Sequence, residues 1–266
     1  MTATRHRIRG VLLDLSGTLH QGSTAIPGAA EAVEKLSDAS LRIRVLTNTS
    51  KTSSSELYQH LQEMGFASIQ PNQIFTSVLT TRDYLIKHNL RPYCLLEDVS
   101  DFKQVDLCVN LDPPHNAVVV GLAPSKFNYE HMNQAFQILQ EYPENLVAIH
   151  RANYVKEEDG SMSLGPGSCI AALEAAANTT AKVVGKPSRD FYASAIWNDI
   201  SPEEICMVGD DVMGDIKGAQ QAGVGTTILV QTGKYREGDE EKAQPTVVVQ
   251  SIVEAVEYIL EHSRDA

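Results

Sequence analysis

Short apolar strands that alternate with helical segments constrain this sequence more than any other feature. The strand candidates include GVLLDL at 10–15, RIRVLTN at 42–48, ICMVGD at 205–210 and GTTILVQ at 225–231, with helical patterns between them. Strands and helices that alternate in this way form a parallel sheet with helices on both faces. We therefore predict an α/β fold with a doubly wound parallel sheet, in which ligands bind at the carboxyl ends of the strands.

The middle of the chain has strands and helices of its own. PYCLLED at 92–98, NAVVVGL at 116–122 and NLVAIH at 145–150 predict strands, and two amphipathic or apolar stretches between 129 and 177 predict helices. This pattern predicts a second α/β domain inserted into the first. We expect the core to comprise residues 1–77 and 182–266, and the insert to comprise residues 78–181.

Composition and charge exclude several classes of protein. The 34 acidic and 22 basic residues give a net charge of −12, which argues against binding to nucleic acid or to an anionic membrane. No apolar run approaches the roughly 20 residues that span a bilayer, and the start of the chain lacks a secretory signal, so we expect a cytoplasmic protein. The four cysteines lack metal-binding spacing, which predicts buried, reduced thiols.

Chemically active residues follow four predicted strand ends that line up on one sheet, and each strand end is followed by a tight turn. Together they supply a carboxylate nucleophile, groups that hold phosphoryl oxygens, a lysine that offsets charge, and acids that hold Mg²⁺. Each alone is ordinary, because a strand-end Asp is commonly a turn residue and such a lysine is commonly solvated. Jointly they predict phosphoryl transfer at one sheet edge. They are Asp14, Ser16, Thr47, Asn48, Lys186, Asp210, Asp211 and Asp215.

These motifs resemble those of the haloacid dehalogenase (HAD) superfamily. DLSGTL corresponds to the first motif DxDGT, TNTSK to the strand-end Ser or Thr, VVGKP to the lysine motif, and GDDVMGD to GDxxxxD. The resemblance extends from about residue 10 to residue 260. It implies a Rossmann-like HAD core, and an insert between the second and third motifs that is similar to the C2-type cap of the NagD-like branch.

The resemblance also implies a metal centre and a nucleophile. Asp14 corresponds to the nucleophile and, through its second oxygen, to an Mg²⁺ ligand. Ser16 corresponds to the residue that offers its backbone carbonyl to the metal, and Asp210 completes the protein ligands. Waters and a phosphoryl oxygen would fill the octahedral shell that Mg²⁺ prefers.

The remaining motif residues are implied to hold the transferring group or to support those that do. Ser16, Thr47, Asn48 and Lys186 correspond to phosphate-binding residues, and Lys186 also counts as catalytic. Asp211 and Asp215 correspond to residues that orient waters or Lys186 rather than bind the metal themselves.

Ser16 replaces the second aspartate of the usual first motif. That aspartate would protonate the leaving atom and deprotonate the attacking water, a contribution of about 10²- to 10⁴-fold. The serine therefore favours substrates whose leaving group needs little protonation, such as phosphoramidates of lysine or histidine, pyrophosphate, acyl phosphates and activated aryl phosphates. His20 offers a substitute proton donor, and the alternative is an exposed loop histidine.

Two further segments offer candidates for substrate recognition. Arg151 and Tyr154 follow the strand NLVAIH, and Arg151 is either a binding group for a second anion or an exposed charge on a turn. Lys234 and Arg236, in TGKYR, are either near the entrance of the site or plain surface charges.

The leading interpretation is an Mg²⁺-dependent phosphatase that forms a phospho-aspartyl intermediate on Asp14. Its expected partner is a small phosphorylated molecule or a phosphoamino acid, and the family resemblance adds a homodimer formed through the cap. The alternative is a catalytically weak or inactive regulatory protein that binds phosphate or a metabolite. A receiver domain fits poorly, because receivers are about half this length and carry their acidic pair early in the chain.

Overall fold

The computed structural model describes residues 7–103, 108–156 and 161–263. The chain divides into two compact units. The first unit comprises Met1–Thr47, Leu57–Phe75 and Lys186–Ala266, and the second comprises Asn48–Glu56 and Thr76–Gly185. The predicted insert spanned residues 78–181, whereas the second unit begins at Thr76, extends to Gly185 and additionally contains residues 48–56. The strand that precedes Lys186 was predicted in the core sheet, but β11 (Lys182–Val183) pairs with β8 (Leu146–Ala148) in the sheet of the second unit.

The first unit is built on a six-stranded sheet with the strand order β14-β13-β12-β1-β4-β5. The pairings from β14 through to β4 are all parallel, with Leu13 opposite Val208 and Asp14 opposite Leu46. This sheet confirms the predicted doubly wound α/β core. Its strands are β1 (Gly10–Asp14), β4 (Arg42–Thr47), β5 (Ile74–Thr76), β12 (Ile205–Gly209), β13 (Thr226–Val230) and β14 (Val247–Val249).

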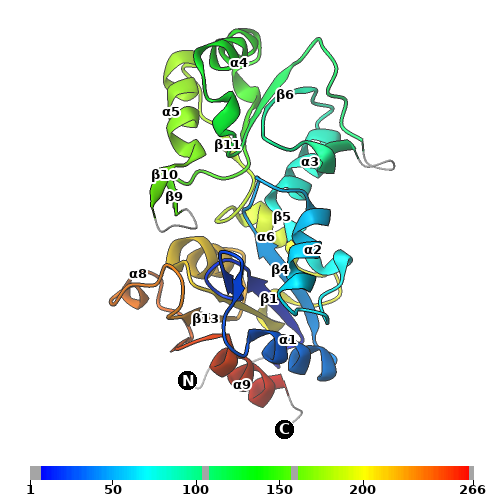
Figure 1. Cartoon of the computed structure of the whole chain (residues 1–266), viewed down its shortest axis with the longest axis vertical. Helices are drawn as coiled ribbons and strands as arrows, with labels where there is room; N and C mark the ends of the chain where they lie inside the picture. The colour runs from blue at the N-terminus through cyan, green and yellow to red at the C-terminus, as the bar shows by residue number, and fades with distance from the viewer. Residues whose placement is uncertain (1–6, 104–107, 157–160, 264–266) are drawn as a thin grey trace. The chain divides into compact units, whose positions relative to one another are not determined.

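Helices cover both faces of this sheet because the central strands are apolar on both sides. Every residue of β1 is buried, and successive side chains of a strand point to opposite faces. Val11 and Leu13 pack with α1 (Ala29–Asp38), α2 (Ser54–Glu63) and α9 (Ile252–Ser263). Leu12 packs with α6 (Arg189–Ala195) and α7 (Gly218–Gln221). Figure 1 shows α1 and α9 side by side on their face.

Shorter elements complete the first unit around the ends of its strands. β2 and β3 form a small antiparallel ribbon directly after β1, and a π-helical turn, η6, follows β12. The elements are β2 (His20–Gln21), β3 (Thr24–Ala25), η1 (Pro71–Gln73), η5 (Pro202–Glu204), η6 (Val212–Lys217) and α8 (Glu240–Ala243).

The second unit repeats the layered arrangement on a smaller sheet. Its strands have the order β11-β8-β7-β6 and pair in parallel. Val119 and Val147 face the cluster that contains α3 residues, and Val118 and Leu146 face α4 and α5. The main elements are α3 (Ser77–Lys87), β6 (Pro92–Leu95), β7 (Ala117–Val120), α4 (Tyr129–Glu141), β8 (Leu146–Ala148), α5 (Pro166–Ala177) and β11 (Lys182–Val183).

The rest of the second unit consists of 3-10 turns and a separate antiparallel ribbon. In the ribbon, Tyr154 lies opposite Leu164, and both side chains are exposed. These elements are η2 (Ser100–Lys103), η3 (Pro124–Lys126), η4 (Pro143–Asn145), β9 (Tyr154–Lys156) and β10 (Met162–Leu164).

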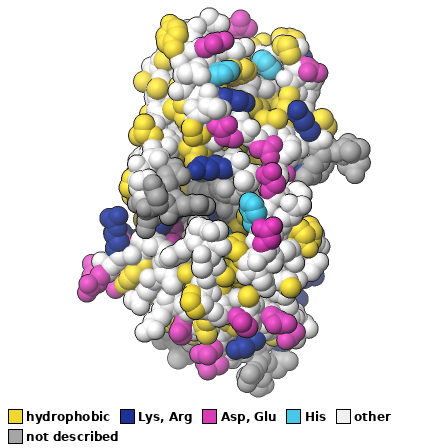
Figure 2. Space-filling model, in the orientation of Figure 1, with side chains coloured by type: hydrophobic (Ala, Val, Ile, Leu, Met, Phe, Trp, Pro, Cys, Tyr) yellow, Lys and Arg dark blue, Asp and Glu magenta, His cyan; other side chains and the backbone are white. Residues whose placement is uncertain are grey.

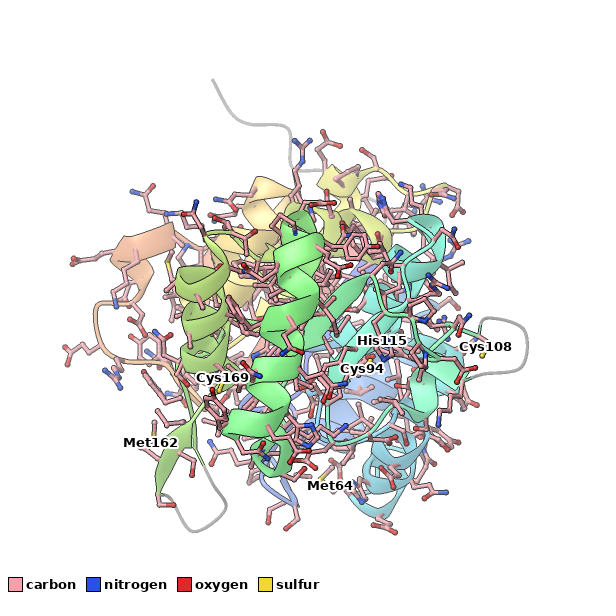
Figure 3. The ribbon with its side chains drawn as sticks, turned by 90° about the horizontal axis from the view of Figure 1, so that it is seen from above. Met64, Cys94, Cys108, His115, Met162 and Cys169 are labelled. Carbon is pink, nitrogen blue, oxygen red and sulfur yellow. The ribbon has the colours of Figure 1, made fainter. Side chains whose placement is uncertain are left out.

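The four cysteines are free thiols, as predicted, but their burial differs from the prediction. Cys206 is buried, Cys94 and Cys169 are half-buried, and Cys108 is exposed because it lies outside the regular elements. Burial raises the pKa of Cys94 to about 12, so this thiol is protonated at neutral pH. Figure 3 shows Cys94, Cys108 and Cys169 at separate places in the molecule.

The surface carries its charge without a concentrated basic region on the face shown. In Figure 2 the acidic side chains are scattered, and basic side chains lie between them. This distribution agrees with the acidic composition. Among the described residues, no helix has both the length and the apolar composition needed to cross a membrane.

Candidate active site

The predicted residues of the first unit meet where neighbouring strands of its sheet end. β4, β1, β12 and β13 are consecutive in the sheet, and because they are parallel, their carboxyl ends share one edge. Thr47 ends β4, Asp14 ends β1, and Asp210 follows β12 directly. The strand order therefore gathers residues that are nearly 200 positions apart in the chain.

Lys186 joins two of the predicted carboxylates in a buried ion-pair network. Its Nζ donates hydrogen bonds to Oδ1 of Asp14 and, at 2.7 Å, to Oδ1 of Asp215. All three side chains are at least nine-tenths buried. Burial acts to lower the pKa of Lys186, but the charges of Asp14 and Asp215 outweigh it and raise the pKa well above its usual value. The lysine is therefore a fixed positive charge beside the nucleophile candidate.

Three buried carboxylates lie close enough together to share one cation. Oxygen atoms of Asp14, Asp210 and Asp215 all lie within 4.8 Å of one another. Burial, together with repulsion from the neighbouring carboxylates, raises the pKa of both Asp210 and Asp215. One lysine does not balance three carboxylates, and a divalent cation would do so. The oxygen donor set fits Mg²⁺, which binds hard oxygen ligands.

The hydrogen bonds of Asp215 and Asp211 separate them from Asp210. Asp215 accepts from Lys186 at one oxygen and from the backbone N–H of Asp211, at 3.1 Å, at the other. Oδ1 of Asp211 accepts from the backbone N–H groups of Met213 and Gly214 at the start of η6. These contacts agree with supporting roles for both residues, although Asp215 lies within the carboxylate cluster itself.

The turn after β1 adds a residue that sequence reasoning missed. Thr18 is fully buried, and its Oγ1 donates to Oδ2 of Asp14 at 3.4 Å. Both carboxylate oxygens of Asp14 therefore have a donor. The threonine belongs to the motif DLSGTL, and its fixed distance of four residues from Asp14 was the available signal. Ser16, between them, has an exposed side chain.

His20 is half-buried and tied to this turn, so it is not the exposed loop histidine of the alternative interpretation. Its backbone carbonyl accepts from the N–H of Gly17 at 2.7 Å, and its Nδ1 lies 2.8 Å from the carbonyl oxygen of Gly22. Because a carbonyl only accepts, Nδ1 carries the proton. Burial lowers the pKa of His20, although the bond to Gly22 and the charge of Asp14 act in the opposite direction.

The loop after β13 also reaches the site. The backbone N–H of Lys234 donates to Oδ2 of Asp210 at 2.6 Å, and Oγ1 of Thr232 donates to the carbonyl of Gly17 at 2.5 Å. The Lys234 ammonium pairs with Oδ2 of Asp211 at 3.1 Å. Lys234 therefore reaches the site through its backbone N–H, while its charged side chain is 70% exposed. The backbone N–H of Arg236 donates to Asp239 instead, in the next turn.

The remaining candidates belong to the second unit. Asn48 is its first residue, directly after Thr47. Arg151 forms a two-point ion pair with Glu174 of α5, with nitrogen–oxygen distances of 2.6 and 2.5 Å. This pairing raises the pKa of Arg151 and engages both terminal nitrogens of its guanidinium, Nη1 and Nη2. Tyr154 lies on β9 with 58% of its surface exposed.

Comparison with known families agrees with this fold. The family model for haloacid dehalogenase-like hydrolases matches residues 11–105, and a second HAD-hydrolase-like model matches residues 183–255. The two matches contain Asp14, Thr47, Lys186 and Asp210. The chain belongs to the haloacid dehalogenase-like hydrolases, as its motifs predicted, and it is a hydrolase of that type.

Particular relatives match the chain over nearly its full length. Haloacid dehalogenase-like hydrolase domain-containing protein 2 from Bos taurus is 44% identical over 98% of this chain and 99% of its own. Human phospholysine phosphohistidine inorganic pyrophosphate phosphatase is 38% identical, with 96% of each chain covered. The solved p-nitrophenyl phosphatase from Archaeoglobus fulgidus has the same fold, with a TM-score of 0.85 at 23% identity, over 95% of this chain and 99% of that one.

Proposed function

We propose that this protein is an Mg²⁺-dependent phosphatase that transfers the phosphoryl group of its substrate to Asp14 and then to water. The observation that carries the proposal is the buried cluster of Asp14, Asp210 and Asp215 with Lys186 as its cation. A cluster with this excess of negative charge suits a divalent metal, and the metal in turn suits a phosphorylated substrate.

In this proposal the metal is held by Asp14, Asp210 and the backbone carbonyl of Ser16. When bound, Mg²⁺ would neutralise charge on the transferring phosphoryl group. Asp14 attacks phosphorus, the bond from phosphorus to the leaving atom breaks, and a phospho-aspartyl anhydride (an acyl phosphate) forms. Water then attacks the same phosphorus and releases inorganic phosphate with free Asp14.

The surrounding side chains hold the nucleophile and the phosphoryl group in place. Lys186 and Thr18 each donate to one oxygen of Asp14 and so limit its rotation. Lys186 also supplies positive charge where the transition state gathers negative charge. Thr47 and Asn48 would bind phosphoryl oxygens. Asp215 and Asp211 would support Lys186 and the loop that carries Asp210.

Ser16 directs the proposed substrate class. A serine hydroxyl does not exchange protons readily near neutral pH, so the leaving group must depart with little protonation. Phosphoramidates of lysine or histidine, pyrophosphate, acyl phosphates and activated aryl phosphates meet this condition. The human relative at 38% identity is named for phospholysine, phosphohistidine and pyrophosphate, which supports the same class.

The test is a substrate panel assayed with the purified full chain. We expect Mg²⁺-dependent release of phosphate from p-nitrophenyl phosphate, pyrophosphate and a phosphoramidate, with sugar monoesters slower. Chelation of the metal and Asp14→Asn should each abolish turnover. Undiminished turnover in Asp14→Asn would refute the covalent mechanism, and Mg²⁺ binding without turnover by the wild type would favour a regulatory, phosphate-binding protein.

Three further parts of the proposal concern the setting of this activity. The second unit would serve as a C2-type cap that selects a small phosphorylated molecule or a phosphoamino acid. Two copies would pair through that cap, which light scattering on the purified protein tests. The protein would act in the cytoplasm, which cell fractionation tests.

A further inference from the structure

We propose that the loop Thr232–Lys234, which we name the 232–234 loop, is a positioning element for the metal ligand Asp210 and for the turn of the nucleophile. This inference rests on the proposed function. The loop follows β13, whose neighbour in the sheet is β12, and β12 in turn neighbours β1. It is therefore placed to connect the Asp210 strand end with the Asp14 strand end.

The first contact fixes the rotation of the Asp210 carboxylate. Oδ2 accepts the backbone N–H of Lys234 at 2.6 Å, and within the described part of the chain Oδ1 accepts no hydrogen bond. Asp210 is 2% exposed, so water cannot readily substitute for this donor. The loop thereby leaves Oδ1 as the oxygen for a cation. A donor that orients a metal-binding carboxylate commonly contributes about 10- to 100-fold to metal affinity.

The second contact ties the same loop to the turn of the nucleophile. Oγ1 of Thr232 donates to the carbonyl oxygen of Gly17 at 2.5 Å, across 215 positions of sequence. Gly17 lies between Ser16, whose carbonyl we propose as a metal ligand, and Thr18, which donates to Asp14. A displacement of the 232–234 loop would therefore alter both sides of the metal site together.

Two glycines allow these loops to approach so closely. A Cβ on Gly233 would lie 2.6 Å from Cα of Gly17 and 2.8 Å from Cγ of Asp210. A Cβ on Gly17 would lie 2.6 Å from Cγ of Asp210 and 2.9 Å from Cα of Gly233. Both glycines also have positive φ, +65° and +92°. No side chain fits between the loop, the turn and the carboxylate, so any addition there must move Asp210.

The decisive variant is Gly233→Ala, with Gly238→Ala as its matched control. Gly238 follows five residues later and also has positive φ, +89°, but a Cβ there would meet nothing within 4 Å. Both variants therefore bear backbone strain, whereas only Gly233→Ala pushes on Asp210. We expect Gly233→Ala to raise the Mg²⁺ concentration for half-maximal turnover by about 10-fold or more. Gly238→Ala should leave that concentration within about 2-fold of the wild type.

The melting temperature, measured without substrate, tests Mg²⁺ binding independently of catalysis. Mg²⁺ raises the melting temperature of any protein that binds it only when folded. We expect the Mg²⁺-dependent rise to shrink in Gly233→Ala and to persist in Gly238→Ala. Equal Mg²⁺ titrations for the two glycine variants, in turnover and in melting temperature, would overturn the positioning role.

Thr232→Val and Thr232→Ser provide a second test if Gly233→Ala does not fold. Valine keeps the shape of the side chain and removes the donor to Gly17, whereas serine keeps the donor. We expect weaker Mg²⁺ binding in Thr232→Val and recovery in Thr232→Ser, and equal weakening in both would contradict the hydrogen-bond role. The proposed function has its own test, because it fails if Asp14→Asn turns over substrate at the wild-type rate. A wild type without any Mg²⁺ response would overturn both proposals.

Discussion

The sheets of the two units share one architecture and differ in the residues that come directly after their strands. Both are parallel and covered by helices on both faces. In the first unit β1 ends on Asp14 and β12 is followed by Asp210, both buried and charged. In the second unit β6 and β8 are followed by Leu96 and Ile149, which are also buried but apolar.

This difference shows that both folds bring strand ends together at one edge of a sheet, and that the residue types at those strand ends determine whether chemistry can occur there. Burying a carboxylate at the end of a strand is costly unless a cation or hydrogen bonds compensate it. In the first unit Lys186 and the 232–234 loop compensate part of that cost, and the proposed metal would compensate the remaining negative charge. The second sheet bears no such cost at these positions, because Leu96 and Ile149 are apolar.

The largest expected effect comes from removing one carboxylate at the first sheet edge. Asp14→Asn should lower kcat by roughly 10⁴-fold or more, because it removes the nucleophile and a partner of Lys186. The matched control is Asp101→Asn in the second unit, a buried carboxylate that accepts from the N–H and Oγ of Ser54. It should lower the melting temperature and leave kcat nearly unchanged. Equal losses of kcat in both variants would remove the distinction between the units.

An intermediate effect is expected in the pH dependence of stability. Burial and carboxylate repulsion raise the pKa of Asp210 to about 8 and that of Asp215 to about 7. Between pH 4 and 8 the folded site therefore holds more protons than the unfolded chain. Without metal, the free energy of unfolding therefore falls as the pH rises through that window, by on the order of several kcal/mol.

Magnesium should reverse that trend, because it binds the deprotonated carboxylates. The Mg²⁺-dependent rise in melting temperature should be small at pH 5 and large at pH 8. Thermal unfolding in chelator and in Mg²⁺ across this range measures it, and the difference between the two curves cancels ionisable groups elsewhere. Asp210→Asn is the control and should flatten the difference. A rise that is independent of pH would show that the buried carboxylates do not form the binding site.

The residues found from sequence and those missed differ in the kind of signal that they leave. Asp14, Thr47 and Asp210 each follow an apolar run, so a strand end and a side-chain type suffice to find them. Lys234 acts on Asp210 through its backbone N–H, which every residue except proline possesses. The sequence offered Lys234 as a charged side chain near the entrance, but the identity of the residue does not indicate this backbone contact. Thr232 contacts Gly17 across 215 positions, and only the order of the strands brings the two together.

The smallest expected effect concerns Arg151 of the second unit. Its side chain is 41% exposed, and its ion pair with Glu174 contributes little to stability, about 0–1 kcal/mol for a pair of this kind. Because Glu174 already occupies the guanidinium, we expect Arg151→Ala to change KM for pyrophosphate by less than about 2-fold. Steady-state kinetics with pyrophosphate and with p-nitrophenyl phosphate measure the change.

Glu174→Gln sharpens the same comparison. It removes the negative partner of Arg151 while Ala181 N–H retains an acceptor at this position. If the ion pair keeps Arg151 away from substrate anions, its loss should lower KM for pyrophosphate and leave KM for p-nitrophenyl phosphate, which has a single phosphoryl group, less affected. A large rise in KM for pyrophosphate in Arg151→Ala would instead show that the guanidinium leaves Glu174 to bind substrate. Recognition by the second unit would then depend on a charge that the first unit does not supply.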